Sequence, residues 1–117
     1  MKRKKPVSAT QKSLKLLRDE GYLCEVVEQT IPYCFIKKDL FGFIDILAIR
    51  DDEVLAVQTT ANLSNANARV KKIEAHENYP KVKKLGWKIV VHGWRQLQEK
   101  YKNGNPKKVW KCKITKL

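Results

Sequence analysis

The stretch FGFIDILAIRDDEVLAVQTT, residues 41–60, decides the fold, because it holds two apolar runs around a short acidic break. The runs at 43–49 and 53–59 have the length and β-branched content of buried strands. Asp51-Asp52 between them can form a two-residue hairpin loop. With that loop, residues whose numbers sum to 103 face each other, so Asp45 is predicted to lie opposite Gln58.

Three polar residues occupy core positions of this hairpin: Asp45, Gln58 and Thr60. Alternation of side chains predicts all three on one face, provided that the pairing does not shift by a single residue. Burial of such groups is costly unless they find partners. Asp45 could bond backbone amides at the start of its strand, with Gln58 and Thr60 bonded to neighbouring strands. Alternatively, the oxygens of Asp45 and Gln58 could hold a hard cation such as Mg²⁺.

The rest of the chain predicts helices and strands around this hairpin. Ser8 and Gln11 form a capping-box pattern and Gly21 is a suitable helix terminator, which predicts a helix over 8–20. The remaining predictions are a strand at 22–29, a loop or irregular strand end near Pro32 and 37–39, a helix at 64–79, a turn at 80–86, a strand at 87–94, a turn or linker at 102–108, and a lysine-bearing edge strand at 109–117.

This order predicts an α/β (α+β) fold in which helices pack on a central mixed sheet. We expect a basic N-terminal arm at 1–7, a domain at 8–95, and a basic extension at 96–117 that adds its edge strand to the same domain. The basic start is not followed by an apolar signal segment, and the longest apolar run is too short to cross a bilayer. The three cysteines lack CxxC spacing and are expected to be reduced, mostly buried thiols, so a cytoplasmic protein is predicted. His76 and His92 are expected to be structural or surface residues.

Charge is unevenly distributed over the 117 residues, whose formal net charge is +13. Residues 1–18 contain seven Lys or Arg and no acid, and residues 81–117 contain twelve Lys or Arg and one acid. Nine acids lie between, at residues 19–60. Basic surfaces bind polyanions with release of counterions, so nucleic acid is the predicted partner and a membrane is not.

The segments KKDLFGFIDILAI, LAVQTT, NARVKKI and GWKIVVHGW together resemble PD-(D/E)XK nucleases, in particular small phage-type and Holliday-junction-resolvase-like members. The resemblance covers about residues 10–95. It implies a restriction-endonuclease-like αβββαβ core, a Mg²⁺- or Mn²⁺-dependent endonuclease acting on DNA, branched DNA included, and a homodimer. A phage-infected or bacterial cell is the implied setting. In this chain Thr60 stands where the family usually has its lysine.

On this resemblance Asp45 is the principal metal ligand and Gln58 the second, assisted by the Thr59 carbonyl and by Asp39, with Glu28 as a further option. Lys71 or Lys72 would replace the family lysine beside Thr60 in the catalytic set. The residues predicted to contact nucleic acid are Lys4, Lys5, Arg69, Lys71, Lys72, Trp94 and Arg95.

Two other functions fit the sequence. A degenerate site on the same fold would leave a protein that only binds nucleic acid. A small basic adaptor or inhibitor would instead bind an acidic protein surface, with little salt-sensitive binding to DNA. Lys71, Lys72 and Arg69 could also be an ordinary solvated helix face.

Overall fold

The computed structural model describes residues 8–31, 36–62 and 65–117. Their order of elements is α1 (Ala9–Asp19), β1 (Leu23–Val26), β2 (Gln29–Ile31), β3 (Ile36–Lys38), β4 (Ile46–Arg50), β5 (Glu53–Thr60), α2 (Ala66–Glu74), α3 (Tyr79–Lys84), β6 (Lys88–Lys100) and β7 (Pro106–Lys116). The predicted basic arm at 1–7, with Lys4 and Lys5, lies outside the described residues.

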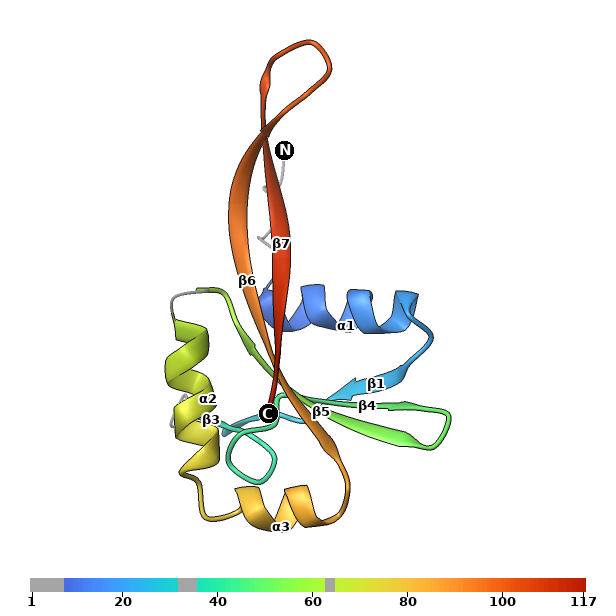
Figure 1. Ribbon diagram of the computed structural model, residues 1–117, viewed down its shortest axis with the longest axis vertical. Coiled ribbons are helices and arrows are strands. Elements are labelled where there is room, and N and C mark those ends of the chain that lie inside the picture. Colours follow the sequence, from blue (N-terminus) through green and yellow to red (C-terminus); the bar gives the residue numbers. More distant parts are fainter. Residues whose placement is uncertain (1–7, 32–35, 63–64) are drawn as a thin grey trace.

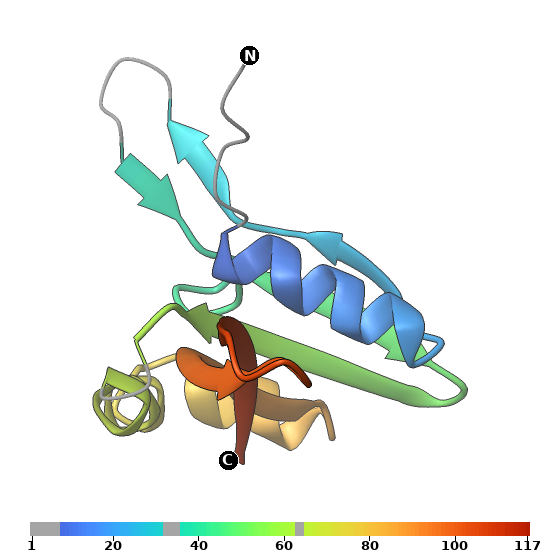
Figure 2. The ribbon, with the colours of Figure 1, turned by 90° about the horizontal axis from the view of Figure 1, so that it is seen from above.

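The main sheet is mixed and has five strands in the order β1-β4-β5-β6-β7. Only β5 and β6 run parallel, and α2 and α3 connect them (Figure 1). In Figure 2, α1 covers one face of this sheet, and α2 and α3 lie on the other. The predicted α+β class with helices on a mixed sheet is confirmed, as is the position of the last strand at the sheet edge. No helix in the described ranges is long and apolar enough to span a bilayer.

The β4–β5 hairpin has the predicted loop and register. β4 ends at Arg50, β5 begins at Glu53, and Ile46 faces Val57, so Asp51 and Asp52 form the loop. Asp51 adopts a positive φ of 54°, which Asp tolerates better than most residues. Sequence therefore predicts the pairing of the central strands correctly.

The two faces of the sheet bury separate apolar clusters. Towards α1, side chains of β4, β5 and β6 pack with Leu14 and Leu17 of that helix. On the other face, Ile73 of α2 and Val82 of α3 pack with residues that include Phe43 and Ala56. Alternation along β5 thus directs Val57 to α1 and Ala56 to α2, which fixes the face of the polar residues that follow.

A buried polar group joins α1 to β6. Ser13 Oγ accepts a hydrogen bond of 2.8 Å from Trp94 Nε1 and lies 2.9 Å from His92 Nδ1. Burial lowers the pKa of His92 to about 4, so the imidazole is neutral at physiological pH. Of the two roles predicted for His92, structural or surface, the structure shows the structural one.

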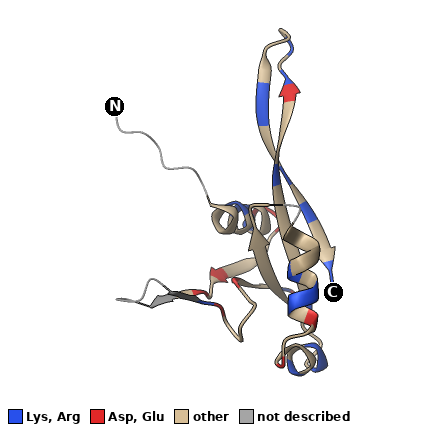
Figure 3. Cartoon of the chain, turned by 90° about the vertical axis from the view of Figure 1, so that its left-hand side faces the viewer, with Lys and Arg blue, Asp and Glu red and all other residues tan. Residues whose placement is uncertain are grey.

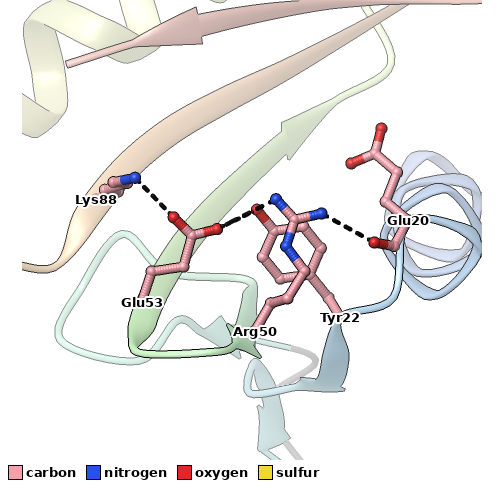
Figure 4. A network of polar contacts seen from close by, with 5 residues as sticks. All are labelled: Glu20, Tyr22, Arg50, Glu53 and Lys88. Carbon is pink, nitrogen blue, oxygen red and sulfur yellow. Dashed lines mark hydrogen bonds and ion pairs between the residues drawn. The ribbon is translucent and has the colours of Figure 1, made fainter.

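A second polar network ties the start of β5 to β6 and to the end of α1 (Figure 4). Glu53 accepts a 2.6 Å bond from Lys88 Nζ and a 2.5 Å bond from the Tyr22 hydroxyl. These bonds hold the pKa of Glu53 below its usual value. Arg50 stacks on the Tyr22 ring and donates to the Glu20 carbonyl at 2.9 Å, which anchors the end of α1.

Two predicted strand boundaries are wrong. The strand expected over 22–29 divides into β1 and β2, and β2 pairs with β3 in a separate two-stranded sheet. The strand expected to end at residue 94 continues to Lys100 and pairs with β7 as far as Pro106. The last three residues of the turn or linker expected at 102–108 are therefore paired strand, whereas its first four form the turn between the two strands. Both faces of this extension are solvated, so its sequence lacks the apolar period from which a strand is recognised.

Candidate metal centre

Three carboxylates converge where β4 begins. One oxygen from each of Glu28, Asp39 and Asp45 lies within 4.8 Å of the other two, a spacing at which they could hold a metal ion. Asp45 is buried, whereas Glu28 and Asp39 are half-buried. We call these three residues the carboxylate triad. Asp39 and Glu28 thus lie beside Asp45, as the sequence suggested.

Backbone contacts bring the triad together from three segments. Val27 donates its amide to the Asp45 carbonyl at 2.9 Å, which places the adjacent Glu28 beside the start of β4. Asp39 begins a tight turn in which Gly42 donates to the Asp39 carbonyl, and Leu40 bridges to Ile44. Asp45 follows this turn directly, so a short loop controls the separation of Asp39 and Asp45.

The turn is locked to the end of α2. Phe41 has a φ of 54° and Gly42 a φ of 90°, and a Cβ on Gly42 would collide with the His76 ring. His76 packs edge-on against Phe43, and Asn78 donates to the Phe41 carbonyl at 3.0 Å. His76 is therefore structural, which is one of the two roles predicted for it, but its contact with the turn could not be predicted from the sequence.

Asp45 does not share a face with Gln58, and this prediction is wrong. The Asp45 amide donates to the Val57 carbonyl, although Val57 is already paired with Ile46. Asp45 and Ile46 thus both lie opposite Val57, as in a β-bulge, and the alternation of side chains shifts by one residue at Asp45. The Asp45 carboxylate consequently meets Thr59, on the α1 side, where Thr59 also bonds the Thr10 hydroxyl at 2.9 Å.

Thr59 holds the Asp45 carboxylate through two donors. Its amide donates to Asp45 Oδ2 at 2.8 Å, and its hydroxyl lies 3.4 Å from the same oxygen. These contacts orient the carboxylate. Both contacts use Oδ2, and they also correspond to the structural alternative for Asp45, in which it bonds backbone amides.

Burial is the largest influence on the ionisation of Asp45 and raises its pKa from 3.8 to about 7. The Thr59 amide acts in the opposite direction, whereas the nearby Asp39 and Glu28 carboxylates raise the pKa further. A triad without a cation therefore disfavours the ionised Asp45. A divalent cation would offset both the desolvation and the mutual repulsion, so the three groups fit such an ion.

The remaining predicted catalytic residues do not join the triad. Gln58 Nε2 donates to the Phe43 carbonyl at 3.2 Å, and Gln58 Oε1 is buried without a partner among the described residues. Thr60 exchanges hydrogen bonds with the backbone of Asn62 and so stabilises the turn after β5. Lys71 and Lys72 are exposed on α2, and in the described part of the chain neither forms an ion pair with the triad.

Of the predicted nucleic-acid contacts, Trp94 is not supported. It is 8% exposed and donates its indole N–H to Ser13, so its ring offers no free face for a base. Arg95 beside it is exposed, and Arg69, on α2, is half-buried. A surface pocket borders the triad at Asp39 and is lined mainly by polar groups, among them Gln29, Lys38, His76 and Asn78.

Comparison with known proteins gives no assignment. No family model matches the chain, and no curated protein matches it at a significant level.

Proposed function

We propose that the protein is a nuclease that uses Mg²⁺ or Mn²⁺ to hydrolyse phosphodiester bonds in DNA, on a PD-(D/E)XK-like fold. The observation that carries the proposal is the convergence of Glu28, Asp39 and Asp45 beside an open pocket on a strongly basic protein. Carboxylates with water and phosphate oxygens are the usual ligands of Mg²⁺. The basic charge supplies the attraction for the polyanion.

Each residue of the site has a defined part in this proposal. Asp45, Asp39 and Glu28 bind the ion, and Thr59 keeps Asp45 in the ligating orientation. His76 and Asn78 fix the turn that carries Asp39. When bound, the divalent ion would polarise a scissile phosphate and lower the pKa of a water molecule. Lys38 is exposed on the pocket wall next to Asp39 and is better placed than Lys71 or Lys72 to contact a phosphate there.

The second candidate is a nucleic-acid-binding protein that has lost cleavage. Two observations favour it: Thr60 replaces the lysine of the resembled family, and Gln58 is engaged by the Phe43 carbonyl. This protein would also bind DNA, and the carboxylate triad would then have only a structural role. The dimer implied by the resemblance belongs to the nuclease proposal, since cutting both strands needs two sites.

Cleavage of labelled DNA distinguishes the two. We expect wild type to cut duplex or branched DNA with Mg²⁺ or Mn²⁺ and not with EDTA. Asp45→Asn should lower the rate by about 100-fold or more, because it removes the ligand that anchors the ion. Asp51→Asn is the matched control, since it removes the same charge from the exposed loop of the same hairpin.

DNA binding by the same proteins, measured in parallel, distinguishes the two proposals if no cleavage is seen. Wild type and Asp45→Asn could both bind DNA in a salt-sensitive way while neither cuts it with any metal. That result would contradict the nuclease proposal and support a protein that only binds nucleic acid. Equal cutting by wild type and Asp45→Asn would place the reaction elsewhere in the chain.

A further inference from the structure

Beyond Gly93, β7 is the only described strand that pairs with β6, and the two strands project from the domain as a ribbon (Figure 1). We call residues 94–112 the arm. Trp94 pairs with Cys112 at its base and Lys100 with Pro106 near its tip. Seven paired residues at about 3.4 Å each give a reach of roughly 24 Å. An isolated two-stranded ribbon gains little stability by itself, so its length requires another explanation.

The arm is strongly basic. It contains six Lys or Arg and one acid, Glu99. Figure 3 shows the blue bands of Lys and Arg along both of its strands. Most of its side chains are exposed. The arm therefore presents a concentrated positive charge on a narrow support that stands away from the acidic triad.

The two faces of the arm differ. The register pairs odd-numbered residues of β6 with odd-numbered residues of β7, so these share a face. Ile89 and Val91 place that face on the α2 side of the sheet. Within the arm this face carries Arg95, Lys107 and Lys111 together with Glu99, and Lys113 continues it at the base of the arm, opposite Gly93. We call Arg95, Lys111 and Lys113 the basic face. Arg69 and the exposed Lys71 and Lys72 belong to α2 on the same side of the sheet.

Like charges oppose each other on the basic face. Arg95 is the direct cross-strand partner of Lys111, and Lys113 follows on the same face, opposite Gly93. Directly opposed like charges destabilise a strand pair. The only acid of the arm, Glu99, lies 3.8 Å from Lys111 and is exposed, so it compensates weakly. A bound polyanion would relieve this repulsion.

We propose that the arm docks into a groove of duplex DNA through its basic face. A two-stranded ribbon fits the major groove of B-form DNA, which is about 12 Å wide, whereas the major groove of duplex RNA is too narrow. Single strands are usually bound on stacking aromatics. The odd-numbered face carries a single aromatic, Tyr101 at the tip of the arm, whose ring Lys107 covers at 5.3 Å. Trp110 belongs to the opposite face, where Lys12 covers its ring at 3.7 Å. The inference shares with the proposed function only the identity of DNA as partner.

Binding of a fluorescent duplex of about 25 base pairs, in EDTA, tests the arm without cleavage. The test variant is Arg95→Gln/Lys111→Gln/Lys113→Gln. The matched control, Lys100→Gln/Lys108→Gln/Lys116→Gln, removes three charges from the opposite face of the same β6–β7 strand pair, two from the arm and one, Lys116, from the sheet below it. We expect the test variant to lose at least tenfold in affinity at 150 mM salt, and the slope of log K against log salt to fall by about 2–3. The control should change both quantities much less.

Because the test variant removes the repulsion between Arg95 and Lys111, its melting temperature should be no lower than that of wild type. A loss of binding can then be distinguished from a loss of folding. Equal losses in the two variants would show only diffuse charge attraction and overturn the inference. Equally tight binding of single-stranded DNA or duplex RNA by wild type would also overturn it. If the protein does not cleave DNA but the test variant alone loses binding, the proposed nuclease activity is wrong and the proposed role of the arm holds. If the protein cleaves DNA but both variants bind equally, the role of the arm is wrong and the nuclease proposal holds.

Discussion

Asp45→Asn should raise the melting temperature of the metal-free protein by on the order of 10 °C at pH 8 and leave it nearly unchanged near pH 4. Burial raises the pKa of the carboxyl to about 7 in the folded protein, against an ordinary pKa of 3.8. Folded Asp45 therefore binds more protons than unfolded Asp45 between these values. Stability consequently falls as pH rises from about 4 through about 7, and asparagine avoids that loss. Asparagine also retains an oxygen for the Thr59 donors.

His92 contributes the opposite slope and must be considered with Asp45. Its pKa is about 4 in the folded protein, so the unfolded imidazole binds the extra proton, and stability falls as pH decreases from 6.5 towards 4. In wild type the two slopes oppose each other over this range. Asp45→Asn should therefore expose the His92 slope, with stability rising from pH 4 to pH 6.5 and then remaining level.

Thermal unfolding in EDTA at pH 4, 6 and 8 measures both effects. Asp51→Asn is again the control, because its carboxylate lies in an exposed loop. A lower melting temperature of Asp45→Asn than of wild type at pH 8 would mean that ionised Asp45 is stabilised by its surroundings, contrary to its burial beside Asp39 and Glu28.

Gly42→Ala should destabilise the protein by about 3 kcal/mol and weaken the triad as well. Gly42 has a φ of 90°, and an added Cβ would strike the His76 ring. To relieve this clash, either His76 after the end of α2 or the turn that carries Asp39 must move. The substitution thus combines backbone strain with a packing clash.

Gly104→Ala separates these two costs. Gly104 has a similar φ of 85°, but nothing lies within 4 Å of the position of its Cβ. Denaturant unfolding should show a loss of about 1 kcal/mol for Gly104→Ala, from backbone strain alone. Equal losses in the two variants would mean that His76 yields without cost and does not hold the turn.

The central pairing of the fold could be predicted because its determinants are local. An Asp51-Asp52 loop between two apolar runs defines the β4–β5 register without knowledge of the rest of the chain. The capping pattern at Ser8 likewise places the start of α1, where Ser8 Oγ accepts from the Gln11 amide. The acidic members of the candidate site were recognised for a similar reason, since Asp39 and Asp45 are close in sequence.

The errors have a physical origin. The sequence of Ile44-Asp45-Ile46 gives no sign of a bulge, because the bulge depends on how the turn at Gly42 meets β5. Simple alternation of side chains therefore places Gln58 on the face of Asp45. Trp94 is predicted as a nucleic-acid contact because Arg95 follows it, and its burial could not be foreseen because its partner Ser13 is distant in sequence. Residues 95–100 gave no strand pattern, because an arm without a core has no buried face to alternate with a solvated one.

Titration of Mn²⁺ into the wild-type protein at pH 8, followed by calorimetry, tests the metal centre most directly. Binding of one ion per chain is expected, with an affinity at least tenfold weaker in Asp45→Asn and unchanged in Asp51→Asn. Absence of binding by wild type, or equal binding by wild type and Asp45→Asn, would contradict a metal centre at Glu28, Asp39 and Asp45.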